Sequence, residues 1–320
     1  MQIVEYRSNR VFPFRSEEPE EFPVVASAVT VGAFDGVHRG HRKIISRMVS
    51  IARQRALRSV VVTFDPHPRR VLGGEVTGPL GLLTTLEEKI TLLRSADVDL
   101  LFVVRFTPEF AMQSSEEFIK NVLVGLLGAK SIVIGYDHGF GRNRSGSGDD
   151  LRRLGLELGF TVDVESEVRI ADEHFSSTRI RQLLGLGRIE EANAFLGSFY
   201  TISGTVVEGD GRGRGLGFPT VNIHIPDPHK LLPQSGVYVA ESNIDGLSWM
   251  AMMNVGVRPT VEDGGRTSVE AHILGWEGSL YGRELSFNLL HFIRRERKFP
   301  TLEALRQQLE KDKKTVELYC

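Results

Sequence analysis

The first half of the chain alternates short apolar runs with segments of helical spacing. The apolar, largely β-branched runs predict buried strands at residues 28–31, 59–64, 100–104, 131–134 and 160–164. Helical spacing and capping patterns predict helices at residues 43–49, from 85, from 114 to 128, and 149–158. Strands this apolar, separated by helices, predict a parallel sheet covered on both faces. The residues before Val24 include an acidic, proline-containing stretch, so we expect an irregular, solvated lead-in.

The pattern changes after about residue 187. Residues 188–196 predict one short helix, and from residue 199 onward the hydrophobic period falls to two. The strands expected here are residues 200–207, 218–225, 236–244, 249–254, 267–274 and 285–293. Short strands with Gly and Pro turns between them indicate a closed or nearly closed antiparallel barrel. A final amphipathic helix, residues 301–313, is expected to pack on its side through Leu302, Leu305 and Leu309.

These patterns divide the chain into three parts. We expect an α/β domain at residues 1–186, a linker helix at 187–198 and a barrel domain at 199–320. A length of 320 residues agrees with two domains, because single hydrophobic cores usually stop growing near ~250–300 residues.

Composition narrows the class of protein. A hydrophobic content of 41% and a charged content of 25% are ordinary for a globular protein. The net charge of -2 gives no general reason to bind nucleic acid or a membrane surface. The single cysteine, Cys320, excludes an intramolecular disulfide and a CxxC redox pair. The first residues lack the apolar region of a signal peptide, and no apolar run reaches bilayer length. We therefore expect a cytoplasmic enzyme or binding protein for small molecules, with a homo-oligomer left open.

The most informative stretch, residues 32–41, links the first buried strand to the first helix. Its three glycines let the backbone turn sharply and approach a ligand closely. A helix N-terminus favours phosphate through its free N–H groups and its dipole. His38 and His41 are three residues apart and are expected to share a face of the first turn, where they would bind phosphate oxygens. We predict a nucleotide site that also includes Gly32, Phe34, Asp35 and Gly40; the alternative is a structural histidine pair.

Two further loops follow strands at the same edge of the predicted sheet. Residues 63–68 contain two prolines that fix a rigid loop, and His67 within it either faces a ligand or caps a turn. Residues 135–141 carry Asp137, which is suited to accept a hydrogen bond from a substrate. Residues 142–146 lack the lysine of a P-loop, so that motif is excluded. An ordinary surface loop is the alternative for this second segment.

The last feature of the first domain is the serine- and threonine-rich start of a helix. Ser177 and Thr178 are typical of plain N-caps, which is the commonest role of such residues. Arg181 follows Thr178 by three residues and would lie on the same helix face, which gives a hydroxyl-plus-guanidinium phosphate site. Because this pattern accompanies the histidine turn, we favour the phosphate interpretation.

The barrel domain opens with a glycine-rich, basic segment at residues 209–217. No frame of this segment gives GxGxxG, and a proline-bearing strand follows it, which excludes a dinucleotide loop. We interpret it as a flap whose backbone N–H groups, including those of Gly213 and Gly217, fold over phosphates. Thr220 and Asn222 are two apart and project on one face of a strand. Their oxygen atoms are hard ligands suited to Mg²⁺.

Two segments of the later strands carry further candidates. Glu270 shares a strand face with Ser268 and His272, and it is a candidate general base for an attacking hydroxyl. A solvated strand face is the alternative. Residues 292–299, which include Arg294, form either a charged surface or a nucleotide-contacting segment.

Together, these motifs resemble two known families. The HxGH pattern at residues 38–41 and the SSTxxR pattern at 176–181 resemble the nucleotidylyltransferase superfamily. Class I aminoacyl-tRNA synthetases share the histidine motif but normally carry a lysine-rich loop that is absent here. Residues 211–222, 236–238, 254–260, 269–272 and 292–299 resemble the riboflavin kinase domain. From about residue 28 to 313 the chain is similar to the prokaryotic bifunctional riboflavin kinase/FMN adenylyltransferase family, also called FAD synthetases.

For the first domain, the resemblance implies a Rossmann-like nucleotidylyltransferase fold that adenylylates FMN with ATP, giving FAD and pyrophosphate. His38 and His41 would bind the ATP phosphates and the transition state. The leaving pyrophosphate would be held by Ser177, Thr178 and Arg181. The flavin would contact Phe64, Pro66, His67 and Asp137.

For the second domain, the resemblance implies a riboflavin kinase barrel with a C-terminal helix, using ATP and Mg²⁺ to make FMN. Thr220 and Asn222 would order the Mg²⁺ and the nucleotide phosphates, and Glu270 would deprotonate the ribityl hydroxyl. Arg294 would contact the flavin.

The chain departs from the family pattern at a few positions. The family usually has GxDFxFG, whereas His138 and Gly139 follow Asp137 here; Phe175 and Val221 replace smaller residues. Two other functions stay open. The barrel could be a flavin- or nucleic-acid-binding module without chemistry, or the altered loop could fit another phosphate substrate in the first site.

Overall fold

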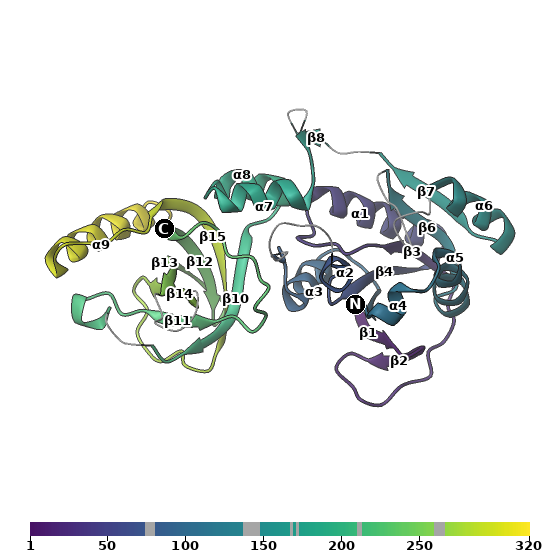
Figure 1. The fold of residues 1–320 in the computed structure, drawn as a ribbon, viewed down its shortest axis with the longest axis horizontal. Helices are drawn as coiled ribbons and strands as arrows, with labels where there is room; N and C mark the ends of the chain where they lie inside the picture. Colours follow the sequence, from purple (N-terminus) through teal and green to yellow (C-terminus); the bar gives the residue numbers. More distant parts are fainter. Residues whose placement is uncertain (74–80, 137–147, 167–168, 171–172, 210–212, 259–265) are drawn as a thin grey trace. The chain divides into compact units, whose positions relative to one another are not determined.

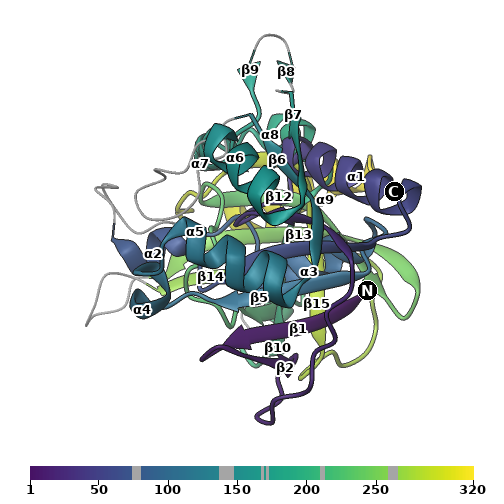
Figure 2. The same ribbon diagram turned by 90° about the vertical axis from the view of Figure 1, so that its right-hand side faces the viewer.

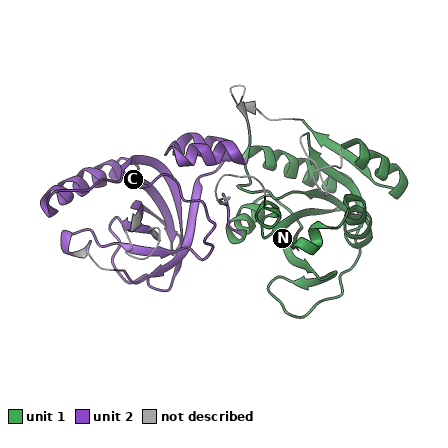
Figure 3. Cartoon of the chain, viewed as in Figure 1, with its two compact units in different colours: residues 1–80, 86–176 green, residues 81–85, 177–320 purple. Residues whose placement is uncertain are grey.

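The computed structural model describes all residues except 74–80, 137–147, 167–168, 171–172, 210–212 and 259–265. The described residues form two compact units (Figure 3). Unit 1 comprises residues 1–80 and 86–176, and unit 2 comprises residues 81–85 and 177–320. The division after Ser176 lies ahead of residue 186, where the change of pattern suggested the end of the first domain.

Over its described residues, unit 1 is built on a sheet of seven strands in the order β2-β1-β5-β4-β3-β6-β7 (Figures 1 and 2). Neighbouring strands from β1 to β7 pair in parallel, and β2 joins the edge in antiparallel. The strands are β1 (Gln2–Arg7), β2 (Arg10–Pro13), β3 (Ser27–Val31), β4 (Arg58–Asp65), β5 (Leu100–Arg105), β6 (Ala129–Gly135) and β7 (Thr161–Glu165), with a hairpin of β8 (Arg169–Ile170) and β9 (Glu173–His174). The helices are α1 (Arg39–Gln54), α2 (Pro68–Leu72), α3 (Leu86–Arg94), α4 (Pro108–Ala111), α5 (Ser115–Phe118), the π-helix η1 (Ile119–Leu126) and α6 (Gly148–Leu158).

Helices cover the sheet on both faces because its strands are apolar on both. Val29 and Val60 face one side, where they pack in a core with η1 and α6. Ala28 and Val61, their chain neighbours, face the other side and pack in a core with α1 and α3. Successive residues of a strand point to opposite faces. The predicted parallel sheet with helices on both sides is therefore confirmed.

The expectation of an irregular lead-in before Val24 is wrong for residues 2–13, whereas residues 14–24 form no helix or strand. Strand β1 pairs in parallel with β5, and β2 pairs with β1. Val4 and Tyr6 of β1 are buried in the core that η1 and α6 cover. The alternation of β1 places these two side chains on the core face, whereas the acidic residues 17–21 lie beyond β2.

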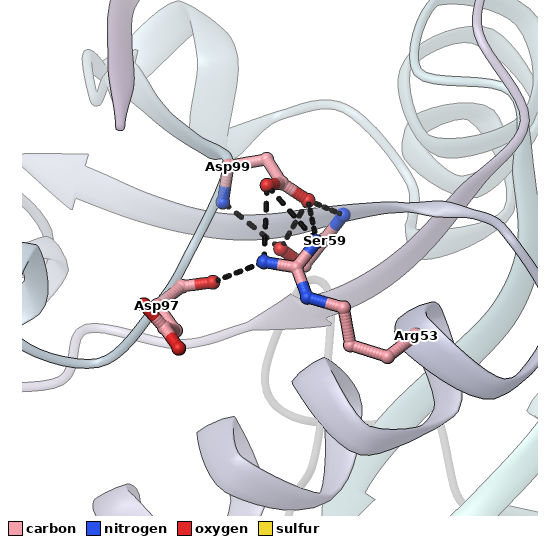
Figure 4. A network of polar contacts seen from close by, with 4 residues as sticks. All are labelled: Arg53, Ser59, Asp97 and Asp99. Carbon is pink, nitrogen blue, oxygen red and sulfur yellow. Dashed lines mark hydrogen bonds and ion pairs between the residues drawn. The ribbon is translucent and has the colours of Figure 1, made fainter.

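A polar network joins the amino-terminal ends of β4 and β5 to the end of α1 (Figure 4). The carboxylate of Asp99 accepts hydrogen bonds from the backbone N–H of Ser59 at 2.8 Å, the Ser59 hydroxyl at 2.7 Å and the Arg53 guanidinium at 3.2 Å. Arg53 also donates to the Asp97 carbonyl at 3.0 Å. These bonds satisfy a strand end that the sheet ladder leaves open, at the edge opposite the carboxyl ends of the strands.

Over its described residues, unit 2 contains a closed barrel of six strands in the order β10-β11-β14-β13-β12-β15. Its neighbouring strands pair in antiparallel, which confirms the predicted barrel. The strands are β10 (Tyr200–Val207), β11 (Val221–His224), β12 (Gly236–Ile244), β13 (Leu247–Arg258), β14 (Arg266–Ile273) and β15 (Glu284–Arg295). The helices are α7 (Ser177–Gly185), α8 (Ile189–Leu196), the 3-10 turn η3 (Arg214–Leu216) and α9 (Leu302–Glu317).

The C-terminal helix α9 packs on the outer face of the barrel. Val316 is buried in a cluster with residues of β12 and β13, and Leu309 is partly buried against the same cluster. Leu302 is 72% exposed, so the predicted apolar face is wrong at its first position. The buried positions of α9 are Asp312 and Val316. The contact face is therefore shifted toward the end of the helix.

A short segment ahead of α3, residues 81–85, belongs to unit 2. The Leu82 N–H donates to the His229 carbonyl at 2.7 Å, and the Leu231 N–H donates to the Leu82 carbonyl at 2.8 Å. The Lys230 ammonium donates to the Leu83 carbonyl at 2.8 Å. An isolated parallel bridge thus holds this segment against the loop that precedes β12.

Candidate active sites

The first candidate site lies where the order of the parallel strands reverses. The chain passes from β3 to β4 on one side, whereas β6 lies on the other side of β3 and is followed by β7. In open α/β sheets, ligands bind outside the carboxyl ends of strands at such a switch point. The loops that follow β3 and β6 are the predicted phosphate turn and the loop that carries Asp137. Asp137 itself lies outside the described residues.

The turn between β3 and α1 has an unusual backbone. Gly36 has φ +84°, as its lack of a side chain allows, but Phe34 and Val37 also have positive φ, at +46° and +41°. A positive φ at a β-branched residue is a true outlier, and such strain concentrates at functional sites. Both side chains are buried, which holds the turn in this conformation. The sequence indicated a glycine-rich turn but not these two strained positions.

His38 and His41 come together as predicted from their spacing. Their ring centroids are 3.6 Å apart and the rings are stacked within 17° of parallel. His38 is the N-cap of α1, and its Nδ1 accepts the backbone N–H of His41 at 3.4 Å. A neutral ring whose Nδ1 accepts carries its proton on Nε2. Nε2–H is then the atom with which His38 can donate to an oxyanion.

Glycines and aromatic rings shape the space around the histidines. A Cβ at Gly40 would lie 3.2 Å from the His38 ring, and a Cβ at Gly32 would lie 3.2 Å from the Phe34 ring. The Phe34 ring meets His41 edge-on, with centroids 5.3 Å apart. The turn therefore contains six of the sequence candidates of unit 1: Gly32, Phe34, Asp35, His38, Gly40 and His41.

The end of β4 and the loop that follows it hold the flavin candidates, which are Phe64 in the strand and Pro66 and His67 in the loop. Phe64 is partly buried and lies 5.6 Å from the Phe106 ring, within a group of aromatic rings. His67 caps α2, because its Nδ1 accepts the backbone N–H of Arg69 at 3.2 Å. The turn-capping alternative is thus real, and a flavin contact at this loop stays a prediction.

Sequence reasoning missed Lys89, which lies beneath the turn. Its ammonium donates to the Ala33 carbonyl at 2.7 Å and to the Thr63 hydroxyl at 3.1 Å. No motif marks this position, because the lysine falls within the apolar spacing of α3.

The residues of the second phosphate motif belong to α7 and therefore to unit 2. Ser177 is the first residue of α7, and Thr178 is exposed. The Arg181 Nε–H donates to the Gly81 carbonyl at 2.8 Å. A phosphate contact by these residues stays a prediction.

The second candidate site is a row of polar side chains on the outer face of the barrel. Asn222 of β11 lies directly opposite Glu270 of β14, which in turn lies directly opposite Asn254 of β13. Residues directly opposite in antiparallel strands project to one face with Cβ atoms ~4.5–5.5 Å apart. All three are half-buried, whereas Val269 and Ala271 on the other face are buried in the barrel. Asn254 is a residue that the sequence did not assign to the site.

Glycines let the backbone approach this row. A Cβ at Gly209 would lie 1.9 Å from the Asn222 amide nitrogen, so any other residue here would displace the Asn222 side chain. A Cβ at Gly256 would lie 2.6 Å from a carboxylate oxygen of Glu296 and 3.1 Å from the Asn254 amide nitrogen. Glu296 therefore brings a second carboxylate to the same face.

Residues 213–217 of the predicted flap lie against the backbone just ahead of β11. A Cβ at Gly213 would lie 2.2 Å from the Phe218 carbonyl oxygen, and Gly217 has φ +84°. Thr220 lies two residues before Asn222 and is half-buried. Beside the flap, a cavity of about 310 Å³ is lined by Gly215, Leu216, Gly217, Leu302, Glu303 and Arg306.

Arg294, a flavin candidate, forms an ion pair with α9. Its guanidinium donates to the Asp312 carboxylate at 2.9 and 2.7 Å, and it also donates to the Arg295 carbonyl at 3.2 Å. These contacts tie β15 to α9. A flavin contact by Arg294 stays a prediction.

The donor set for a metal consists of oxygen atoms from different residue types. Within the described ranges, no group of three or more His, Cys, Asp or Glu side chains could hold a metal ion. The predicted ligands, Thr220 and Asn222, instead offer a hydroxyl and an amide oxygen. Such hard ligands fit Mg²⁺, which usually keeps several waters and takes further oxygens from phosphates.

Known proteins resemble both domains of this chain. The family model described as FAD synthetase matches residues 24–179, and the one described as riboflavin kinase matches residues 196–320. A bifunctional riboflavin kinase/FMN adenylyltransferase from Listeria monocytogenes is 37% identical over 92% of each chain. This chain belongs to the bifunctional riboflavin kinase/FMN adenylyltransferase family. An Escherichia coli member of the family is 35% identical and covers 94% of this chain and 93% of its own.

A solved structure from Streptococcus pneumoniae has the same fold as this family member. It superposes with a TM-score of 0.83 at 30% identity and covers 93% of this chain and 96% of its own. Its title calls it a macrolide-efflux protein. No helix in the part of our chain that the structure describes is long and apolar enough to cross a membrane.

Proposed function

We propose that this protein makes FAD in two steps, with riboflavin phosphorylation on the barrel and FMN adenylylation at the β3–α1 turn. The proposal is supported most by the fact that each candidate site lies within the family segment whose reaction it suits. A phosphate-suited turn lies within the FAD synthetase segment, and an oxygen-rich strand face lies within the riboflavin kinase segment. The product of the second domain is the substrate of the first.

In the kinase step, the Glu270 carboxylate accepts the proton of the ribityl hydroxyl as that oxygen bonds to the γ-phosphorus of ATP. The bond from the γ-phosphorus to the bridging oxygen breaks, and ADP leaves with the electron pair. Thr220 and Asn222 would hold Mg²⁺, which supplies charge neutralisation on the phosphates when bound. Asn254, opposite Glu270, orients the carboxylate.

For the flavin ring of the kinase substrate, the cavity beside the flap is the candidate binding place. Leu216 and Leu302 give it apolar walls, and Gly215 and Gly217 leave room for a flat ring. Arg306 supplies donors for the carbonyl edge of the ring. Arg294 supports this arrangement through its ion pair with α9, the helix that carries Leu302 and Arg306.

In the adenylyl step, a phosphate oxygen of FMN bonds to the α-phosphorus of a second ATP, and the bond to the β-phosphate oxygen breaks to release pyrophosphate. His38 Nε2–H and His41 donate to the phosphate oxygens as charge develops. The N-terminus of α1 adds its dipole and free N–H groups. Ser177, Thr178 and Arg181 hold the pyrophosphate. Phe64 at the end of β4, Pro66 and His67 in the loop after it, and Asp137 hold the flavin. A cytoplasmic location and a homo-oligomer stay predictions.

The test separates the two steps. Wild-type protein with riboflavin, ATP and Mg²⁺ should yield both FMN and FAD by chromatography. The Glu270→Gln variant should lose riboflavin phosphorylation by ~10²–10⁴-fold and still convert supplied FMN to FAD. The His38→Ala variant should stop at FMN. Glu284→Gln, an exposed carboxylate on β15, is the matched control and should behave as wild type.

Absence of both products from wild-type protein would refute the proposed function. Normal phosphorylation by Glu270→Gln would refute the base assignment alone. If riboflavin binds but is never phosphorylated, the barrel is a binding module. If FMN is not adenylylated while another phosphate substrate is, the first site serves that substrate.

A further inference from the structure

Lys89 is a buried charge that neither proposed reaction uses. Lys89 is 6% exposed and lies on the face of α3 that also buries Ile90 and Leu93. Lysines are almost never this buried unless the ammonium is paired. The pattern of α3 predicts an apolar residue at this position, so the lysine needs another explanation.

The ammonium joins the ends of two neighbouring strands. It donates to the Ala33 carbonyl at 2.7 Å and to the Thr63 hydroxyl at 3.1 Å, and the Thr63 hydroxyl donates to the Ala33 carbonyl at 3.1 Å. Thr63 lies in β4, and Ala33 follows β3. Ala33 immediately precedes Phe34, the first residue of the turn with positive φ. The bonds therefore fix the turn at the point where it leaves the sheet.

The charge of Lys89 also matters to its surroundings. Burial lowers the pKa of the ammonium, and the carboxylates of Asp35 and Asp65 oppose that shift. Asp35 is itself buried within the turn, and Asp65 ends β4. Lys89 thus offsets two negative charges at the sheet edge where the negative phosphates of ATP are expected. Without it, these carboxylates would repel the phosphates.

We infer that Lys89 is a positioning residue for FMN adenylylation, which fixes the strained turn that carries His38 and His41 and offsets the carboxylates beside it. A methionine would fill the same volume and avoid the desolvation of a charge. The lysine instead donates to the carbonyl of Ala33, the residue just ahead of the strained positions of the turn. This inference rests on the proposed adenylyl transfer at that turn.

The test uses the full chain and the kinase reaction as an internal control. Lys89→Met should lower kcat for the conversion of FMN to FAD on the order of 10²-fold, the effect of a small misplacement of catalytic groups. The KM for ATP should rise less than kcat falls, because the histidines act mainly in the transition state. Phosphorylation of riboflavin by the same sample should stay at the wild-type rate. Lys120→Met, an exposed lysine that pairs with Glu116, is the matched control and should leave both reactions unchanged.

A second variant keeps the inference testable if Lys89→Met does not fold. Thr63→Val removes one acceptor of the ammonium and one donor to Ala33 while leaving the charge in place. It should lower kcat for FAD formation severalfold at an unchanged rate of riboflavin phosphorylation. Wild-type kcat for FAD formation in Lys89→Met, or in Thr63→Val where the first variant is unfolded, overturns the inference. Failure of the proposed function would differ, because wild-type protein itself would then form no FAD.

Discussion

The ion pair between Arg294 and Asp312 gives the most quantitative prediction. The guanidinium donates to one carboxylate oxygen at 2.9 and 2.7 Å and to the other at 3.1 Å, and Gln308 donates to the carboxylate at 2.7 Å. The side chain of Asp312 is 1% exposed and that of Arg294 is 17% exposed. The pair is thus buried, forked and fully within unit 2. It is the polar contact that fixes α9 on β15.

The expected loss of stability in Asp312→Ala follows from the buried charge of Arg294 that would lose its partner. Breaking a buried pair by removing one partner costs about 3–5 kcal/mol, because the other charge stays buried without compensation. Arg294 keeps some contact with water, so we expect the lower end, about 3 kcal/mol, for Asp312→Ala. At ~2–4 °C per kcal/mol for a domain of this size, the midpoint should fall by roughly 6–12 °C. The double variant Arg294→Met/Asp312→Leu removes both charges and should recover most of this loss.

Tryptophan fluorescence is a selective assay for this unit. The chain has two tryptophans, Trp249 and Trp276, and both lie in unit 2 with ring centroids 5.1 Å apart. Thermal and urea unfolding followed at this signal therefore reports the barrel. Asp245→Ala breaks the exposed Arg283–Asp245 pair and is the matched control, for which we expect no shift of the midpoint.

Two results would refute this reasoning. An unchanged midpoint in Asp312→Ala would mean that the pair is not buried in solution. A double variant as unstable as the single one would mean that packing of α9, rather than charge, accounts for the loss. Because α9 also lines the cavity beside the flap, Asp312→Ala should raise the KM for riboflavin as well.

Two further predictions concern unit 1. Burial alone would raise the pKa of Asp99, but hydrogen bonds from Ser59 and Arg53 bring that pKa below its usual value. The resulting stability is present above the unfolded-state pKa of ~3.9 and is lost as pH falls through the lower pKa of the folded state. Ser59→Ala should therefore move the acid-unfolding midpoint to higher pH, and an unchanged midpoint would contradict this. Gly128 has φ +64°, and a Cβ there would lie 2.6 Å from the Val25 carbonyl oxygen. Gly128→Ala should therefore destabilise unit 1 by more than ~1 kcal/mol in urea unfolding, and a stability equal to wild type would show that the backbone relaxes freely.

The sequence predicted those strands whose hydrophobic pattern is regular along their whole length. The runs at 28–31 and 59–64 are apolar on both faces, and the structure places them at the centre of the sheet as β3 and β4. In the barrel, the period of two gave β10 and β12 with their observed bounds. These patterns succeed because burial on known faces leaves few alternatives. Strand β1 escaped because an acidic stretch nearby suggested solvent, although its own alternation was regular.

Pairing across strands was beyond the sequence. The spacing of Thr220 and Asn222 predicted a shared strand face, although Thr220 precedes β11. Only the register places Asn222 opposite Glu270, which lies opposite Asn254. Register depends on where each turn ends, and residues far apart in the chain carry no local signal of it. The same limit hid residues 81–85, whose partners lie near residue 230.

The phosphate turn can be recognised from the sequence, whereas Lys89, which we infer positions it, cannot. Histidines and glycines at the end of a buried strand are chemically conspicuous, because few structural roles need them together. Lys89 acts through a carbonyl and a hydroxyl that any chain could offer, and its helix has an ordinary amphipathic pattern. Its role is visible only from the bonds to Ala33 and from the strained residues that follow. Candidate catalytic groups can thus be predicted from residue type, whereas the groups that position them are recognised only from their contacts in the structure. A lower kcat for FAD formation in Lys89→Met, with riboflavin phosphorylation unchanged, would show that such contacts carry functional information.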